Sequence, residues 1–309
     1  MKIYYPSDQN FTIAECVATV GFFDGVHAGH RFLIHEMISL AKLKKRPSVV
    51  FTFAVHPRKV LHSDFQPALL TTLDEKLVQL QTTGIDACVV LDFSVGMSKL
   101  TAYEFLKTIL FDQYNVRTLL VGHDHRFGHN RAEGFADYLR YGAEMGLEII
   151  QAKRYATTEF NHISSSEVRL ALQGGDIVNA NQLLSYKYSF VGEVIDGFKV
   201  GRKIGFPTAN VEPEDVEKLI PAIGVYAVEV NWNDTNYIGM MNIGIRPTMA
   251  NGNKTSLEVN IFDFDENIYH EKLRISFVQK IREELKFNSI DELIEQLKRD
   301  KQTVLEVLG

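Results

Sequence analysis

Cysteine is scarce in this sequence, which contains only Cys16 and Cys88 among its 309 residues. Both lie in apolar, strand-like runs, so we expect reduced core residues, no disulfide framework and a cytoplasmic location. Long apolar stretches are also missing, since no run approaches the roughly 18 residues that a membrane-spanning helix needs. The segment Met1–Pro6 lacks the apolar core of a signal peptide. We therefore expect neither secretion nor a membrane partner.

An excess of basic residues is missing as well. The net charge is −6, whereas a large nucleic-acid-binding surface normally carries a surplus of lysine and arginine. We therefore expect no nucleic-acid partner. The length of 309 residues allows about two domains. Nine of the ten histidines lie at or before His162, which indicates that the two halves carry different chemistry.

Strand-like and helix-like patterns alternate through the first half. We predict strands at Cys16–Val20, Pro47–Phe53, Ala87–Leu91, Arg117–Val121 and Leu147–Gln151. Helices are expected between them, near 29–45 and at Leu73–Gln81, Thr101–Phe111 and Gly134–Met145. This alternation predicts an α/β domain with a parallel sheet and helices on both faces. Ligands of such sheets bind beyond the carboxyl ends of the strands.

A glycine-rich turn joins the first of these strands to its helix, and His27 and His30 stand at the helix start. Unpaired backbone N–H groups at a helix start attract anions, and residues three apart share a helix face. Gly29, between the histidines, allows a ligand to approach the backbone closely. Two imidazoles here suit the α-phosphate of a nucleotide. In the alternative interpretation, one histidine caps the helix and the other is a surface residue.

The His-x-Gly-His run resembles the signature of nucleotidyltransferases and class I aminoacyl-tRNA synthetases, and the acidic net charge weighs against a synthetase. The longer run at 21–30 resembles one branch, the bacterial bifunctional riboflavin kinase/FMN adenylyltransferases, also called FAD synthetases. This resemblance implies a Rossmann-like nucleotidyltransferase domain in which His27 and His30 are catalytic. It implies that ATP or flavin is bound by Gly21, Phe22, Asp24 and Gly29.

Two further polar clusters follow predicted strands. His56 comes after the second strand, and the run at 122–131 comes after Leu119–Val121. Strand ends that carry His, Asp and Arg can converge on one anionic ligand. The second run resembles the family's Val-Gly-x-Asp-x-Arg-Phe-Gly motif, which implies flavin or nucleotide contacts for Asp124, Arg126 and Phe127. His56 is a candidate for the same pocket because it follows a neighbouring strand. A zinc or iron site at its histidines is disfavoured because no tetrahedral ligand set accompanies them.

A hydroxyl-rich helix start follows at Ile163–Arg169. Ser164 and Glu167 have capping-box spacing, which is compatible with a phosphate site because a capped terminus keeps free N–H groups. The run resembles the family's Ile-Ser-Ser-Ser/Thr-x-Val/Ile-Arg motif, which implies phosphate contacts for Ser164 and Ser165 and a catalytic Arg169. The run Gly96–Leu100 looks like half of a synthetase Lys-Met-Ser-Lys-Ser loop. We reject that interpretation because the adjoining Thr101 opens a capping box.

The second half consists of strand-like runs separated by turns. We predict strands at Tyr188–Ile195, Gly224–Trp232, Asn236–Ile243, Ser256–Phe262 and Lys272–Phe277, followed by helices at Ile290–Leu297 and Thr303–Leu308. The pattern predicts a small antiparallel β-barrel closed by C-terminal helices. We place the domain boundary between 184 and 185. Ser185–Tyr188 stands where the family usually has Gly-Arg-Pro-Tyr.

Three glycines at spacing four, Gly197, Gly201 and Gly205, precede a Pro207–Asn210 turn. The loop is not a Walker A motif, because it lacks the terminal Gly-Lys-Ser/Thr. Thr208 and Asn210 offer hard oxygen ligands for Mg²⁺. The run resembles the Gly-Arg-x-x-Gly-Phe-Pro-Thr-Ala-Asn signature of riboflavin kinases. The resemblance implies ATP or flavin contacts for Gly201, Lys203, Gly205, Pro207, Arg246, Arg282 and Glu283.

Glu258 is the candidate carboxylate for a kinase. It lies between Leu257 and Val259 in a predicted strand and so faces the side opposite to both. Without the resemblance, an ordinary exposed strand glutamate is the better interpretation; with it, Glu258 aligns with the catalytic base. Asn260 stands where family members usually carry histidine.

The two motif sets together predict a bifunctional flavin-cofactor enzyme. Riboflavin is phosphorylated by MgATP in the second half, and the resulting FMN is adenylylated by a second ATP in the first half. We expect small-molecule partners, riboflavin, FMN and ATP, and a monomer or weak homo-oligomer. The rivals are a chain with one working activity and a flavin-binding or flavin-sensing module without turnover.

Overall fold

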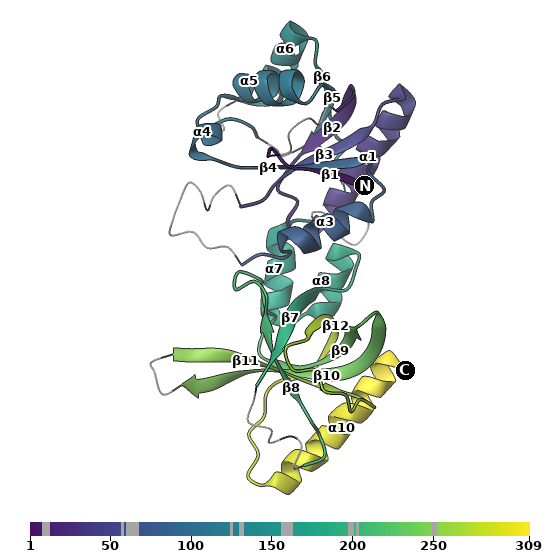
Figure 1. Cartoon of the computed structure of the whole chain (residues 1–309), viewed down its shortest axis with the longest axis vertical. Helices are drawn as coiled ribbons and strands as arrows, with labels where there is room; N and C mark the ends of the chain where they lie inside the picture. The colour runs from purple at the N-terminus through teal and green to yellow at the C-terminus, as the bar shows by residue number, and fades with distance from the viewer. Residues whose placement is uncertain are drawn as a thin grey trace. The chain divides into compact units, whose positions relative to one another are not determined.

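The computed structural model describes residues 1–7, 13–56, 59, 68–123, 126–129, 133–155, 163–196, 201, 204–248 and 252–309, with backbone alone at 246–248 and 252–254. The chain divides into two compact units, Met1–Ser164 and Ser165–Gly309 (Figure 1). In the described part of the chain, none of the helices combines the length and the apolar character needed to cross a membrane.

The first unit is a parallel sheet flanked by helices. Its strands are β1 (Lys2–Tyr4), β2 (Cys16–Val20), β3 (Ser48–Phe53), β4 (Ala87–Leu91), β5 (Val116–Val121) and β6 (Glu148–Gln151). Its helices are η1 (Asp24–Val26), α1 (Ala28–Lys44), α3 (Leu73–Gln81), α4 (Val95–Ser98), α5 (Ala102–Glu104), the π-helical η2 (Phe105–Gln113) and α6 (Phe135–Met145). The predicted alternation of strands and helices is confirmed. Strand β1 is not predicted, because three residues are too short to show a period.

The strand order of the sheet is β1-β4-β3-β2-β5-β6, and every pairing is parallel. Strand β2 is central, with β3 on one side and β5 on the other. The chain order therefore reverses next to β2. Such a switch point opens a crevice beyond the carboxyl ends of the strands, where open α/β sheets bind ligands. The turn with the two histidines leaves β2 at this point.

Each face of the sheet has its own hydrophobic core. Val17 and Val50 face α1 and α3, where Ile34, Met37 and Leu80 cover them. The alternate residues of the same strands face η2 and α6, and this second core contains Ala18, Phe51, Val89, Leu106 and Tyr138. Two-sided burial explains why the strands are continuous apolar runs. Cys16 and Cys88 are free and buried, as predicted, and burial raises the pKa of each thiol to about 12.

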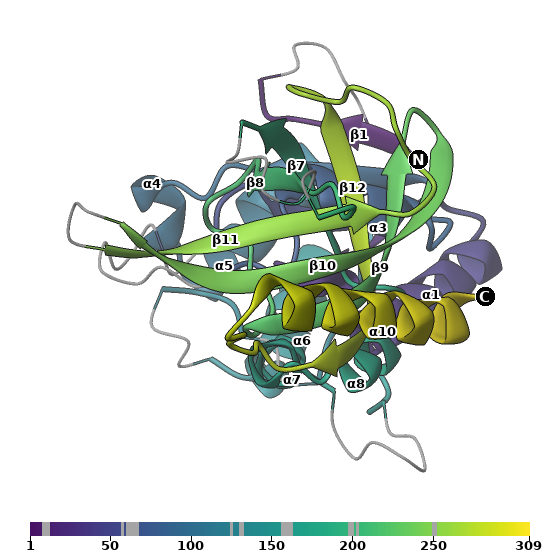
Figure 2. The ribbon, with the colours of Figure 1, turned by 90° about the horizontal axis from the view of Figure 1, so that it is seen from below.

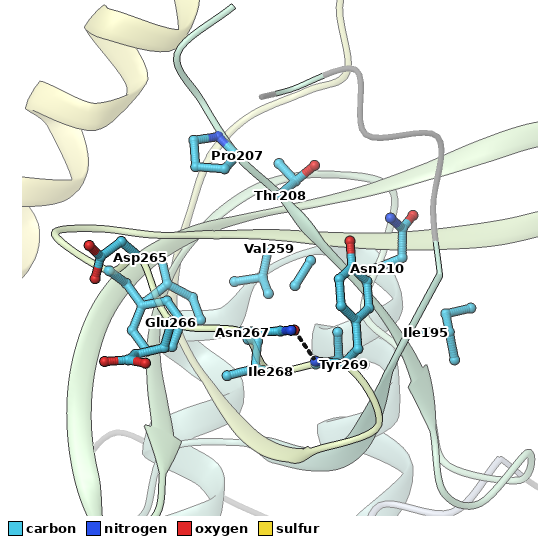
Figure 3. Close-up of a pocket in the computed structure, with 14 residues that line it drawn as sticks. Ile195, Pro207, Thr208, Asn210, Val259, Asp265, Glu266, Asn267, Ile268 and Tyr269 are labelled. Carbon is cyan, nitrogen blue, oxygen red and sulfur yellow. Dashed lines mark hydrogen bonds between the residues drawn. The ribbon is translucent and has the colours of Figure 1, made fainter. Parts of the chain in front are cut away.

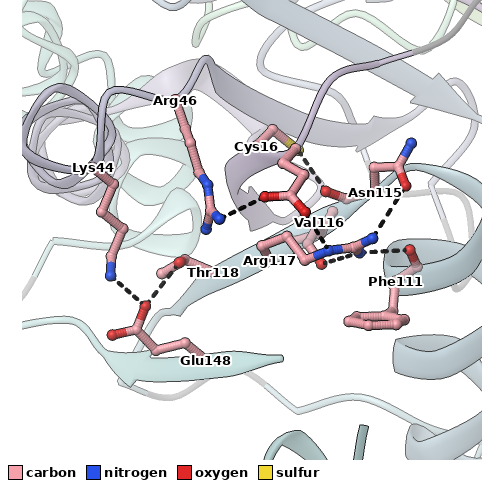
Figure 4. A network of polar contacts seen from close by, with 10 residues as sticks. Cys16, Lys44, Arg46, Phe111, Asn115, Val116, Arg117, Thr118 and Glu148 are labelled. Carbon is pink, nitrogen blue, oxygen red and sulfur yellow. Dashed lines mark hydrogen bonds and ion pairs between the residues drawn. The ribbon is translucent and has the colours of Figure 1, made fainter. Parts of the chain in front are cut away.

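The amino ends of the strands are closed by a network of charged side chains (Figure 4). Glu148 accepts a hydrogen bond from Thr118 Oγ1 at 2.8 Å and pairs with Lys44 at 2.6 Å. The Lys44 hydrogen bond is the main reason that the pKa of Glu148 is lowered. Glu15 pairs with Arg46 at 2.6 Å and with Arg117 at 3.3 Å. These ion pairs and hydrogen bonds thus lie at the amino ends of the strands, opposite the end where the histidine turn lies.

The second unit begins with two helices and continues as a closed antiparallel barrel. The helices are α7 (Ser165–Gly174) and α8 (Ile177–Leu184). The strands, followed by the last helix, are β7 (Ser189–Ile195), β8 (Ala209–Pro213), β9 (Gly224–Trp232), β10 (Thr235–Thr248), β11 (Gly252–Ile261), β12 (Lys272–Arg282) and α10 (Ile290–Leu308). The barrel closes in the order β10-β11-β8-β7-β12-β9. The predicted antiparallel barrel is confirmed.

Two details of the prediction are wrong. Residues 290–308 form one helix, α10, which lies along the barrel (Figure 2). No Gly or Pro interrupts the stretch between the two predicted helices, and its Asp300 is buried against the barrel. The predicted turn at Pro207–Asn210 gives way to strand β8 at Ala209, because Ala209 and Asn210 pair with β11.

Helices α7 and α8 pack on the barrel. Asn181 Nδ2 donates to Phe277 O at 2.9 Å, and Ala222 N donates to Leu172 O at 3.0 Å. These helices therefore belong to the second unit. A functional boundary between 184 and 185 stays a prediction.

Adding one methyl group at Gly142 should destabilise the first unit. A Cβ on this residue of α6 would lie 2.4 Å from Leu147 O, a backbone atom that cannot move aside easily. We expect Gly142→Ala to lower the free energy of unfolding by about 1–3 kcal/mol in urea denaturation. Gly96→Ala is the matched control, because its Cβ would meet only Ser94 Oγ, at 3.5 Å. Equal losses in the two variants would contradict this account.

Candidate functional site

The turn after β2 holds an unusual backbone. Gly21 N donates to Phe51 O at 3.0 Å, which continues the sheet pairing for one residue beyond the strand. Phe23, Gly25 and Val26 then adopt positive φ values of 54°, 77° and 38°. Glycine accepts this region readily, whereas each of the other two residues costs on the order of 1–3 kcal/mol. Strain of this kind persists only where surrounding contacts over-determine the conformation.

Asp24 supplies part of that restraint. Its side chain is buried, and its carboxylate accepts hydrogen bonds from the backbone N–H groups of Leu70 and Thr71 at 3.0 and 3.1 Å. Thr71 Oγ1 in turn accepts a hydrogen bond from Gly25 N at 3.0 Å. The described contacts of Asp24 thus fasten the turn to the segment before α3. A direct contact of Asp24 with ATP or flavin stays a prediction.

His27 and His30 come together at the start of α1. His27 is the N-cap, and its Nδ1 accepts a hydrogen bond from His30 N at 3.3 Å. An accepting Nδ1 leaves the proton of a neutral ring on Nε2. The two rings stack with centroids 3.6 Å apart and an interplanar angle of 18°. Capping and catalysis are therefore compatible roles for His27, since its Nε2–H remains a donor.

The environment of His30 favours the neutral imidazole. Burial, followed by the charges of His27 and Lys76, lowers the pKa of His30 well below 6.5. Its Nδ1 is buried and has no hydrogen-bond partner among the described residues. The Phe23 ring stands edge-on to the His30 ring at 5.1 Å and limits the access of water. A neutral His30 can thus present an N–H donor to a developing negative charge at pH 7.

Other residues predicted for this site lie close to the histidines. A Cβ on Gly29 would lie 3.3 Å from the His27 ring and 3.4 Å from Ile163 O. Ile163, the first residue of the hydroxyl-rich run, therefore adjoins the start of α1. The ring of Phe22 stands edge-on to the ring of His56 at 4.5 Å. The structure therefore brings the ends of β2 and β3 together and places Ile163 O beside the helix start, whereas the convergence of the third strand end on the same ligand stays a prediction.

The remaining candidates in the first half are less closely tied to this cluster. Phe127 is buried in the core against Phe105, with ring centroids 5.7 Å apart, and Arg126 Nη1 donates to Glu133 O at 3.2 Å. Their ligand contacts stay predictions, and Asp124 lies outside the described residues. Helix α7 begins at Ser165, as the capping box predicts. That Ser165 and Arg169 reach the histidine turn also stays a prediction.

One residue near the turn is not predicted from the sequence. Lys76 is 2% exposed, and its Nζ donates to Phe53 O at 2.8 Å and to Phe22 O at 3.2 Å. Burial lowers the pKa of Lys76 to about 8. In the sequence it is one lysine within a helical pattern, and only the fold reveals that it points inward.

The barrel carries a second cluster on three neighbouring strands. Glu258 of β11 pairs in register with Asn242 of β10 on one side and with Asn210 of β8 on the other. Residues paired in this way share one face of the sheet, so these three side chains form a row. Leu257 and Val259 are buried on the other face, which confirms the predicted alternation. Asn242 is a member of this row that the sequence prediction omits.

Two cavities flank this row. One of about 310 Å³ is lined by Asn242, Glu258, Asn260, Arg282 and apolar side chains that include Phe206 and Leu297. The other, of about 400 Å³, is lined by Thr208, Asn210 and the segment 264–269 (Figure 3). Thr208 lines both cavities. A flat apolar ring in the first cavity and a polyphosphate near the second would meet at Thr208.

Several of the predicted loop residues lie in the segment that precedes β8, where backbone contacts fix the conformation. Gly201 needs the absence of a side chain, since a Cβ would lie 2.2 Å from Phe206 O. Pro207 O accepts a hydrogen bond from Asn260 Nδ2 at 2.6 Å, so Asn260 anchors the segment that carries Thr208 and leads into β8. Gly205 lies in a turn before this segment, with a positive φ of 81°. Lys203 and the side chain of Arg246 lie outside the described residues.

Arg282 is held at the cavity wall by α10. Its Nε and Nη2 donate to the Asp300 carboxylate at 2.9 and 2.6 Å, and Gln296 Nε2 donates to the same carboxylate at 2.8 Å. The neighbouring Glu283 instead pairs with Lys280 at 2.7 Å and does not line this cavity. Glu284 and Asp300 do line it. A flavin contact for Glu283 stays a prediction.

Comparison with known proteins agrees with this two-site arrangement. A family model described as FAD synthetase matches residues 10–167, and one described as riboflavin kinase matches residues 184–308. The bifunctional riboflavin kinase/FMN adenylyltransferases of Escherichia coli (strain K12) and Bacillus subtilis are each 37% identical. These alignments cover 95% and 94% of this chain and 93% and 92% of the relatives. A solved structure from Streptococcus pneumoniae, described as a macrolide-efflux protein, has a TM-score of 0.89 at 31% identity and covers 98% of this chain and 99% of that one.

The half-buried His30 should make the folded state sensitive to acid. Its folded pKa is lowered, so below about pH 6.5 the unfolded chain binds a proton that the folded chain refuses. The free energy of unfolding should therefore fall as the pH drops below that value. In urea denaturation across this range, His30→Gln should lose part of the fall. His35→Gln removes an exposed histidine from the same helix and should retain it. An unchanged pH dependence in His30→Gln would sink the idea.

The buried pair of Arg282 and Asp300 should be needed for the docking of α10. The two side chains are 17% and 4% exposed. Asp300→Asn leaves the guanidinium without its carboxylate and should lower the free energy of unfolding by about 3–5 kcal/mol. Glu295→Gln is the control, because it breaks an exposed pair with Lys298 on the same helix and should cause no measurable change. Similar losses in both variants would show that the buried pair has no special weight.

Proposed function

The chain belongs to the family of bifunctional riboflavin kinases/FMN adenylyltransferases, and from this premise we propose that it makes FAD from riboflavin in two ATP-dependent steps. The barrel transfers the γ-phosphoryl group of ATP to the terminal hydroxyl of riboflavin and yields FMN. The α/β unit then joins the FMN phosphate to the AMP part of a second ATP. The observation that carries the proposal is that one chain contains both sites. Its α/β unit has two stacked histidines at a sheet switch point, and its closed barrel has a row of polar side chains centred on Glu258.

Adenylyl transfer needs alignment and charge stabilisation more than it needs a protein nucleophile. An oxygen of the FMN phosphate attacks the α-phosphorus of ATP, the bond to the bridging oxygen breaks, and pyrophosphate leaves. His27 and His30 present imidazole donors at a helix start, which suits the α-phosphate as its charge develops. Arg169 and the serines at 164–165 are proposed to hold the leaving phosphates.

The kinase step needs a carboxylate near the attacking hydroxyl and a hard cation on the phosphates. Glu258 is proposed as the base that accepts the proton of riboflavin, whose ring occupies the cavity bordered by Phe206 and Arg282. Thr208 Oγ1 and Asn210 Oδ1, beside the Glu258 carboxylate, form a set of hard oxygens that fits Mg²⁺. When bound, Mg²⁺ would neutralise charge on the phosphates of ATP.

The proposal includes the finer predictions made from the sequence. We propose a cytoplasmic enzyme that acts as a monomer or weak homo-oligomer, with functional domains at 1–184 and 185–309. Its partners are riboflavin, FMN and ATP. The two buried, free cysteines are compatible with a reducing compartment.

Flavin chromatography after incubation with riboflavin, ATP and Mg²⁺ tests both steps in one time course. We expect FMN to appear first and then to convert to FAD. His27→Ala/His30→Ala should stop the reaction at FMN, with FAD formation lowered on the order of 100-fold or more. Thr208→Ala/Asn210→Ala should block FMN formation and still convert added FMN to FAD.

Each failure identifies one rival. FMN that accumulates in the wild type, with added FMN unused, would mean that the adenylyltransferase half is silent. No product from riboflavin, but FAD from FMN, would remove the kinase half. Tight flavin binding without consumption of ATP would favour a flavin-binding module instead.

A further inference from the structure

Lys76 stands out among the described lysines because it is buried next to the histidine turn. It lies on α3, outside the short motifs from which the site residues were predicted, and only 2% of it is exposed. Its Nζ donates to Phe53 O, at the end of β3, and to Phe22 O, in the turn after β2. The ammonium also lies 4.1 Å from the centre of the Phe22 ring. One cation therefore joins the ends of two adjacent parallel strands.

The partners of this ammonium are neutral. The described contacts of Lys76 Nζ are with two backbone carbonyls and the Phe22 ring, and Asp24 is near enough to raise its pKa. Taking an ammonium out of water costs several kcal/mol, and two carbonyl oxygens and an aromatic face offset that cost only in part. A neutral donor could bridge two carbonyls with less desolvation. A buried cation kept under these conditions in a crevice points to a functional role.

The segment at 70–76 restrains the histidine turn at two points, which supports a functional role for Lys76. Leu70 and Thr71 hold the Asp24 carboxylate on one side of the turn, and Lys76 holds Phe22 O on the other. Thr52 Oγ1 also donates to Phe22 O, at 3.0 Å. The strained residues between these anchors lead directly into His27.

We propose that Lys76 is a positioning residue for adenylyl transfer, whose ammonium clamps the carbonyls of Phe22 and Phe53 and so holds the His27–His30 pair in the orientation that receives the α-phosphate. This inference rests on the proposed function of the same site. Lys76 acts through the turn; it is not assigned a contact with the reacting atoms.

The charge of Lys76 adds an electrostatic effect. Burial lowers the pKa of Lys76 to about 8, while Asp24 and the Cys88 thiol act in the opposite direction. The ammonium form therefore prevails at pH 7 and is lost as the pH rises through about 8. The charged Lys76 also helps to lower the pKa of His30, together with burial and His27. Loss of the cation should weaken the clamp and raise the pKa of His30.

Lys76→Met tests the clamp, because methionine has a similar length and no donor. We expect kcat for FAD formation from FMN to fall on the order of 10- to 100-fold, since small misalignments cost that much. The KM for ATP should change far less. FMN formation from riboflavin by the same preparation should keep its wild-type rate. Lys42→Met, an exposed position on α1, is the matched control and should retain both activities.

The pH profile separates positioning from general stability. Wild-type FAD formation should decline as the pH rises through about 8, where the ammonium is lost. Lys76→Met should lack this alkaline decline. Lys76→Arg retains a cation at all accessible pH values, so its FAD formation should persist above that range. Imidazole NMR titration should show a higher pKa for His30 in Lys76→Met than in the wild type.

Three results would overturn the proposal. Lys76→Met could form FAD at the wild-type rate with an unchanged pH profile. In the second result, Lys76→Met loses both activities in parallel with its stability. In the third, Lys76→Arg keeps the wild-type alkaline decline. Either of these two results would mean that Lys76 has only a structural role. A wild type that forms no FAD from FMN would instead defeat the proposed function itself, so the two failures are distinguishable.

Discussion

The first unit depends on how a strained turn is held at the end of a central strand. Phe23 and Val26 have left-handed backbones, and nothing in their own side chains favours that conformation. The turn is held from outside, by backbone N–H groups on Asp24 and by donors on Phe22 O. This constraint sets where α1 begins and therefore where its two histidines stack. A site that must stabilise charge benefits from such restraint, because its donors are aligned before the substrate arrives.

The charged residues at the two ends of the parallel sheet have different environments. At the amino ends, exposed and half-buried ion pairs join Glu15 and Glu148 to basic residues. At the carboxyl ends, the described Asp24 and Lys76 are more deeply buried, and backbone atoms are prominent among their partners. Asp24 binds backbone N–H groups, and Lys76 binds backbone carbonyls. Buried charges that hold backbone in this way keep the crevice rigid without filling it with side-chain ion pairs.

The barrel reaches a rigid site by a different route. Closure gives every strand two neighbours, so the register alone lines up Asn242, Glu258 and Asn210. The apolar wall of the adjoining cavity comes in part from α10, which is fixed through the buried pair of Arg282 and Asp300. The hydrogen bond of Asn260 to Pro207 O anchors the segment that carries Thr208, just before β8. Both units thus place catalytic candidates on regular elements and hold the adjoining loops with buried polar contacts.

The amino-acid sequence by itself determined the class of each half and the identity of most candidate residues. Hydrophobic periodicity and local motifs are short-range signals, so the parallel sheet, the barrel and the histidine turn could be predicted, whereas Glu258 was singled out only through the family resemblance. The tertiary structure alone decided which side chains face one another. Lys76, Asn242 and Asp300 look ordinary in the sequence, because their importance comes from partners at Phe22, Glu258 and Arg282, far away in the chain. Phe127 and Glu283 show the converse, since a motif position does not reveal whether its side chain turns into the core, toward a cavity or toward a surface lysine. Long-range packing decides that direction, and no local pattern encodes it.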